Sequence, residues 1–230
     1  RPHVAIRGES REGTVFRLRD QAAGMQDAAD PRGVFTTGSF WEPGDHESGG
    51  GNKAFRNNFS DFTLDTGRGN PGAIGIDWAV SNIGAIERVT LRDSGRCALR
   101  GISAARQIPG PGLVKDVRIE GFEHALHLDD IQYGISVADC EFTGARACGI
   151  VTGKNLLHAF RVKVAGAPVA LDVSRVEGVA TLVDCELEGD VRKTGSVFTD
   201  AASADGLALL RQMPTRFPQP SAASWGAERP

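Results

Sequence analysis

A repeat of about 23 residues is the feature that most restricts how this chain can fold. The sequence contains six copies of this repeat. Each copy begins with a pattern of six residues in which the first, fourth and sixth are apolar. The middle apolar residues are Phe62, Val89, Val117, Cys140, Val162 and Cys185. A second short apolar segment follows each copy, at 75–78, 101–103, 125–128, 148–151, 170–173 and 196–198.

A period of 22–28 residues that holds only short strands and turns predicts an all-β fold, a single-stranded parallel β-helix or solenoid. Equivalent apolar residues point inward and stack on their copies in the next coil, about 4.8 Å away. We expect a right-handed helix of about seven or more coils. Residues 4–18 fit one earlier copy. A leucine-rich repeat would need its L-x-x-L-x-L-x-x-N core, which this sequence lacks, and a β-sandwich would not keep one register over six copies.

Two outward columns support this register. One reads Arg118, Glu141, Lys163 and Glu186, which would form a ladder of alternating charge. The other reads Asp61, Arg88, Asp116, Asp139, Arg161 and Asp184, which we interpret as a surface ladder.

The domain organisation follows from where the repeat stops. We expect the β-helix over residues 1–200, with a loop insertion at 25–58 that includes a Gly-Gly-Gly run, and a terminal segment and Pro/Ala-rich linker at 201–230. Within that segment, 206–213 fits a short helix or a last strand. Since the chain begins at Arg1 inside an apparent strand, we expect a fragment of a longer protein.

Composition restricts the function classes. The net charge of −3 argues against a nucleic-acid partner. The sequence contains no run of 18 apolar residues, which a membrane-spanning helix would need. Glycine, at 29 of 230 residues, indicates many tight turns. Of the four cysteines, Cys140 and Cys185 would share an inward column two coils apart, about 9.6 Å and too far for a disulfide. We therefore expect buried free thiols and no zinc site.

Three segments, 59–77, 84–91 and 110–122, resemble the pectate-lyase superfamily of right-handed β-helix proteins, in its rhamnogalacturonase-like and glycoside hydrolase family 55-like branch. The resemblance covers about residues 3–200 and implies a carbohydrate-active protein, extracellular or periplasmic, whose partner is a polysaccharide or oligosaccharide. The tail is similar to the connector to a second β-helix domain, which would lie outside this chain. The resemblance implies no cofactor, apart from Ca²⁺ if the protein is a lyase.

Candidate catalytic residues come from the outward positions of the second strands. His127, Asp129 and Asp130 form one cluster, in which imidazole and carboxyl groups would act as acid and base. Asp129-Asp130 is also the one dipeptide that matches the motifs of the polygalacturonases in family 28. Asp77 and Asp172 share the outward column of His127, but about 19 Å apart they are too distant for a glycosidase pair, and we expect them to bind substrate.

The insertion supplies the other candidates for substrate binding. Trp41 would stack on a sugar ring, while Glu42, Asp45 and His46 would bind polar groups. The predicted function is hydrolysis or lyase cleavage of an extracellular polysaccharide. The alternatives are a non-catalytic module that binds polysaccharide or supports a catalytic domain, and a structural, tailspike-like β-helix.

Overall fold

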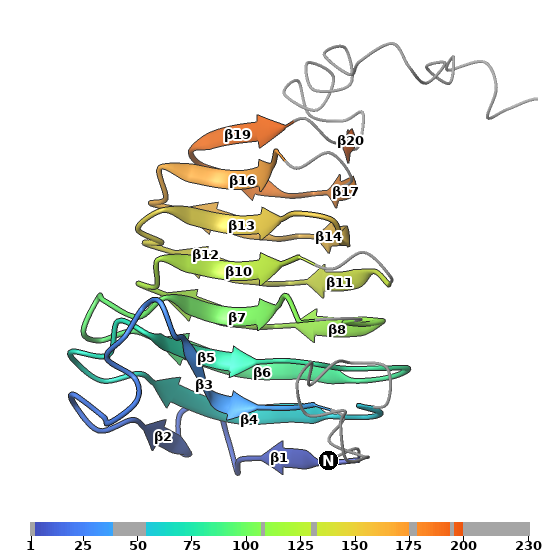
Figure 1. Cartoon of the computed structure of the whole chain (residues 1–230). Coiled ribbons are helices and arrows are strands. Elements are labelled where there is room, and N and C mark those ends of the chain that lie inside the picture. Colours follow the sequence, from blue (N-terminus) through green and yellow to red (C-terminus); the bar gives the residue numbers. More distant parts are fainter. Residues whose placement is uncertain are drawn as a thin grey trace, which may run out of the picture.

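The computed structural model describes residues 3–38, 54–106, 109–129, 133–174, 179–193 and 196–199, and within them every regular element is a β-strand. The strands wind into a solenoid of about five turns in which all pairings are parallel (Figure 1). In the same residues, no helix is long and apolar enough to cross a membrane. The all-β, parallel solenoid predicted from the repeat is confirmed.

Two sheets run along the solenoid. The seven strands of the first, called sheet B here, are β3 (Arg32–Thr36), β5 (Ala73–Asp77), β7 (Arg100–Ala104), β10 (His124–Leu128), β13 (Cys148–Thr152), β16 (Val169–Val173) and β19 (Asp190–Lys193). They pair in chain order from β3 to β19.

The thirteen strands of the other, sheet A, carry the six-copy pattern. They are β1 (Ala5–Arg7), β2 (Val15–Arg17), β4 (Asn58–Asp65), β6 (Ala85–Arg92), β8 (Gly112–Lys115), β9 (Arg118–Glu120), β11 (Ile135–Ala138), β12 (Glu141–Thr143), β14 (Leu156–Phe160), β15 (Lys163–Ala165), β17 (Val179–Val183), β18 (Glu186–Leu187) and β20 (Ser196–Thr199).

Sheet A bends at one residue in each coil, and this residue is always Asp or Arg. These residues have a positive φ of 50–62°, in the left-handed region: Asp61, Arg88, Asp116, Asp139, Arg161 and Asp184. The N–H groups of Asp116, Asp139 and Arg161 donate to carbonyl oxygens of the next coil, which holds the bend in place. The bend separates strand pairs such as β8 and β9, so the coils with such pairs contain three short strands, whereas β4 and β6 run through the bend.

The core is made of the stacked inward columns. Phe142 on β12 lies in register with Ile119 and Val164 on the adjacent coils, and all three side chains are buried. On sheet B the residue before the inward Ile or Leu is always small. A Cβ at Gly101 would come within 2.4 Å of the Ile119 side chain, so this position leaves no room for a larger residue.

The registers confirm most of the predicted strand positions and correct one. The predicted ladder of Arg118, Glu141, Lys163 and Glu186 is in register. The segment at 196–198, expected to continue sheet B, is instead β20 in sheet A, because β19 already occupies that place in the last coil.

The predicted insertion at 25–58 contains β3, which extends sheet B beside β5. Sequence periodicity missed β3 because it is a lone strand without a copy of the six-copy pattern directly before it. The segment at 201–230, including 206–213, lies outside the described residues.

Candidate functional site on the outer face of sheet B

The outer face of sheet B carries one column of polar side chains that the repeat predicted. Register partners follow one another across six strands: Asp77, Ser103, His127, Val151, Asp172 and Arg192. Asp77, His127 and Asp172 are the members that the sequence analysis named. Arg192 belongs to β19, which takes the place in this sheet predicted for 196–198.

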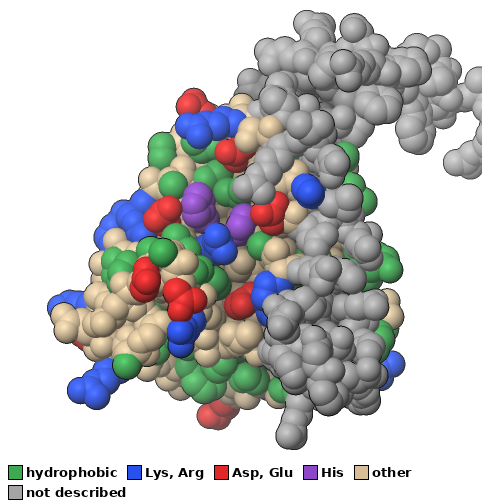
Figure 2. Space-filling model, in the orientation of Figure 1, with side chains coloured by type: hydrophobic (Ala, Val, Ile, Leu, Met, Phe, Trp, Pro, Cys, Tyr) green, Lys and Arg blue, Asp and Glu red, His purple; other side chains and the backbone are tan. Residues whose placement is uncertain are grey.

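A second column, three residues earlier on each strand, adds two groups that the sequence analysis did not select. Arg100 on β7 is in register with His124 on β10. The His124 and His127 rings lie 6.3 Å apart between centroids, tilted by 33°. Figure 2 shows two neighbouring histidines over sheet B, surrounded by acidic and basic side chains. Two strands thus bring Arg100, Ser103, His124 and His127 together.

His127 and Asp129 lie at the carboxyl end of β10. The His127 Nε2 atom is 4.0 Å from Asp129 Oδ2, and the two side chains are 12% and 26% exposed. At this distance a carboxylate stabilises a protonated imidazole, and the half-buried setting strengthens the interaction. Asp130, the third predicted member of the cluster, lies outside the described residues.

Asp77 is held by an arginine from the following coil. Arg106 donates from Nε to Asp77 Oδ1 at 2.9 Å, and its Nη2 donates to the carbonyl oxygens of Asp77 and Thr37. Burial raises the pKa of Asp77, and attraction by Arg106 and Arg100 offsets only part of that effect. The carboxyl group is therefore fixed in orientation and more easily protonated than a solvated Asp.

Arg100 and His124 are both poorly hydrated. The Arg100 Nε atom and the His124 Nδ1 atom are buried and have no hydrogen-bond partner. Burial lowers the pKa of His124, with attraction by Glu123 opposing it, so the ring favours its neutral form. Burial also lowers the pKa of Arg100, against attraction by Asp77, Asp129 and Glu123.

Asp172 lies apart from this cluster. It is three strands beyond Ser103 in the column, and its Oδ1 accepts the N–H of Ser174 at 2.9 Å. Asp77 and Asp172 are four strands apart, about 19 Å, so the structure agrees with the expectation that they are no glycosidase pair.

The insertion that contains the other candidates is anchored beside this face. Thr37 exchanges hydrogen bonds with Ala79, and the Ala54 carbonyl accepts the N–H of Ser81. Trp41, Glu42, Asp45 and His46 lie outside the described residues.

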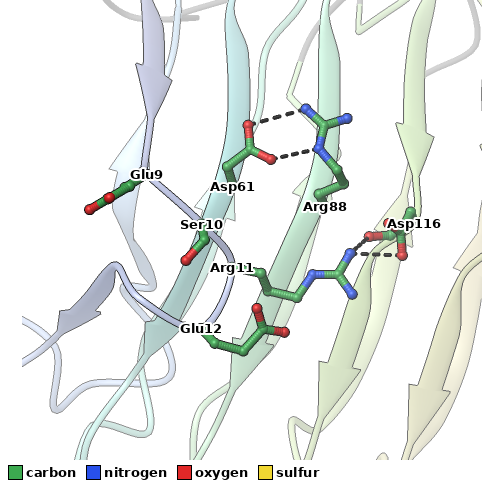
Figure 3. Close-up of a pocket in the computed structure, with 7 residues that line it drawn as sticks. All are labelled: Glu9, Ser10, Arg11, Glu12, Asp61, Arg88 and Asp116. Carbon is green, nitrogen blue, oxygen red and sulfur yellow. Dashed lines mark hydrogen bonds and ion pairs between the residues drawn. The ribbon is translucent and has the colours of Figure 1, made fainter.

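A pocket of about 290 Å³ lies elsewhere, where the N-terminal loop crosses the bend of sheet A (Figure 3). Arg88 forms two hydrogen bonds with Asp61, at 2.6 and 3.1 Å, and these hold the pKa of Asp61 at about 2. Arg11 reaches from the loop to Asp116, 2.7 Å between Nη2 and Oδ1. The basic groups of this pocket pair with its own carboxylates and fasten the loop, which we interpret as a structural role.

A second pocket, of about 400 Å³, is floored by Gly121 and Gly144. Its buried carboxylate, Asp93, accepts hydrogen bonds from the N–H of Ala98 and from Arg146. Asp93 therefore contributes to the fold rather than to a reactive site.

No metal site emerges from the part of the chain that the structure describes, in which no three His, Cys, Asp or Glu side chains are grouped to hold an ion. The four cysteines are free thiols. Cys140 and Cys148 are buried, as predicted, and burial raises the pKa of each to about 12. Cys97 and Cys185 are only half-buried.

Three residues of the face escaped the sequence analysis: Arg100, His124 and Arg106. Arg100 and His124 share a column with Ile74, Cys148 and Val169, so two polar residues stand between apolar neighbours in this column. That interruption was a usable signal. Arg106 lies in a turn outside the repeat, and its contact with Asp77 had no signature in the sequence.

Comparison with known proteins adds no relative. No protein family, no curated protein and no solved structure matches this chain.

Proposed function

We propose that this chain is a carbohydrate-active β-solenoid of the pectate-lyase superfamily that binds an extracellular or periplasmic polysaccharide along sheet B and cleaves it by hydrolysis or elimination. The observation that carries the proposal is the row of half-buried Asp, Arg and His side chains on one rigid face. A linear polymer lying along the solenoid axis would meet a new outward side chain about every 4.8 Å.

The chemistry on this face suits cleavage of a glycosidic bond. His127, with its Nε2 atom 4.0 Å from Asp129 Oδ2, provides an imidazole of the kind that acts as general acid or base. Asp77, with its raised pKa, provides a carboxyl group that Arg106 orients. In hydrolysis one such group protonates the glycosidic oxygen while another activates water. In elimination, which requires a uronic acid because its carboxyl group makes the C5 proton acidic, a base removes that proton. The glycosidic oxygen then leaves with a proton from an acid, which creates an unsaturated sugar.

The resemblance of 59–77, 84–91 and 110–122 to the superfamily supports the same function. We also propose, from the repeat, a right-handed helix with seven or more coils. The presence of seven strands in sheet B supports that number.

The test is an activity screen with the purified chain on pectic, β-glucan, xylan and alginate polysaccharides. New reducing ends without ultraviolet absorbance would indicate hydrolysis, and both signals together would indicate elimination. We expect His127→Ala, Asp129→Asn and Asp77→Asn each to reduce the rate by at least about 100-fold. Glu141→Gln, on the outer face of sheet A, is the matched control and should retain full activity.

Three results would contradict the proposal. Cleavage that survives all three sheet B substitutions would move the site elsewhere. Binding of a polysaccharide without cleavage would replace the enzyme by a binding module, and the absence of both binding and cleavage would favour a structural β-helix.

A further inference from the structure

Arg100 on β7 has a buried Nε donor that no acceptor satisfies among the described residues. In the described residues, no carboxylate lies within ion-pair distance of its guanidinium, and its Nε atom is both buried and without an acceptor. Leaving such a donor buried and unpaired destabilises the folded chain, and more so for a charged group. By contrast, Arg106 on the same face donates to Asp77 and Thr37.

The charge of Arg100 is nevertheless compensated. Asp77, Asp129 and Glu123 all attract it at longer range. Arg106 pairs with only one of them, Asp77. What Arg100 lacks is therefore a set of nearby oxygen acceptors, not a counter-charge.

The same carboxylates decide what kind of acceptor fits. Asp77, Asp129 and Glu123 act on Arg100 at longer range, and Arg106 pairs with Asp77. Arg146 acts on His124, which favours its neutral form because burial lowers its pKa. A carboxylate or sulfate brought to this place would be repelled by Asp129 and Glu123. An uncharged hydroxyl or ring oxygen would accept from the guanidinium without that repulsion.

We infer that Arg100 is a ligand-binding residue and that it donates hydrogen bonds to hydroxyl or ring oxygens of an uncharged sugar, so that the face recognises a neutral polysaccharide rather than one of uronic acids. The inference rests on the proposed function and names its substrate class. His124, beside Arg100 in register, provides a further polar group for the same sugar unit.

Binding, rather than activity, is the measurement that tests this inference. The wild-type chain is titrated at pH 7 by calorimetry with neutral oligosaccharides (β-glucan, xylan and galactan series) and with uronates (oligogalacturonate and alginate series). We expect tighter binding of at least one neutral series. Its affinity should change by less than about twofold between 50 and 500 mM NaCl, because no ion pair forms with the ligand.

Two variants locate the interaction. Arg100→Met keeps the volume and removes the donors, and should weaken binding by about tenfold or more. Arg100→Lys keeps the charge but loses the planar fork, and should also weaken binding. The matched control is Arg118→Met on the outer face of sheet A, which should bind as the wild type does. In the wild-type protein, the ¹⁵N–¹H signal of Arg100 Nε should shift and become protected from exchange on titration, a readout that requires no substitution.

The outcomes separate the two proposals. Tighter binding of uronates than of neutral sugars overturns this inference and leaves the proposed function standing. Unchanged binding by Arg100→Met, or an unmoved Nε signal at saturation, also overturns it. Failure to bind any glycan contradicts the proposed function and removes the inference with it.

Discussion

Replacing Phe142 by Ala tests whether the inward columns form one continuous core. The Phe142 side chain is fully buried and lies between Ile119 and Val164 of the adjacent coils. Each of these neighbours is itself stacked in the solenoid, so the backbone cannot collapse into the space that the ring leaves. The cavity should therefore persist.

The size of the effect follows from the buried area. A buried aromatic side chain removes about 150–250 Å² from water, worth about 4–6 kcal/mol at 25 cal/mol per Å². The Ala methyl group recovers part of this, while the remaining cavity adds a cost. Measured Phe→Ala changes of about 3–5 kcal/mol agree with this balance. A loss of about 4 kcal/mol is a large part of the 5–15 kcal/mol that stabilises a typical domain.

Urea unfolding followed by circular dichroism measures this loss. The control is Glu141→Ala, one residue away on the outer face, which should cost about 1 kcal/mol or less because its side chain is exposed. Phe142→Leu should fall between the two. A loss below about 1.5 kcal/mol for Phe142→Ala, or one equal to that of Glu141→Ala, would refute the close stacking of coils.

Three further predictions concern charge and space. The pKa of Asp61 is about 2 in the folded chain, against an ordinary value of 3.8, so Asp61→Asn should lower the free energy of unfolding above pH 4. The difference from the wild type should disappear as the pH falls to 2. A difference that stays constant when urea unfolding is measured across this pH range would contradict the prediction. Arg106→Met removes a hydrogen bond to Asp77, so the pKa of Asp77 should rise further in an NMR titration of its carboxyl carbon, and an unchanged or lower pKa would count against the proposed pairing. Gly101→Val should lower the free energy of unfolding by at least about 1–3 kcal/mol, because the new Cβ atom would clash with the Ile119 side chain. A variant that unfolds at the same temperature as the wild type would exclude that clash.

The outer face of sheet B shows how much of the candidate site sequence periodicity could predict. It placed Asp77, His127 and Asp172 in one column, and the registers confirm that column. It did not select Arg100 or His124, because these two polar residues depart from the apolar pattern of their column instead of repeating along it.

The bend of sheet A is a second feature that sequence periodicity predicted only in part. Periodicity placed Asp61, Arg88 and Asp116 in one outward column, but it did not predict their left-handed backbone. Asp is among the residues that tolerate this conformation, while Arg gives no such signal. The ion pairs and the inter-coil hydrogen bonds that hold the bend become visible only once adjacent coils are in place.

The sequence by itself determined the inward columns and the parallel register, because each coil must bury the same positions against its copies and a shift by one residue would expose them. The tertiary structure alone decided which groups meet on the outside. Arg106 reaches Asp77 and Arg11 reaches Asp116 from turns and loops that follow no period. No burial pattern encodes such contacts, since their geometry depends on how the coils are connected.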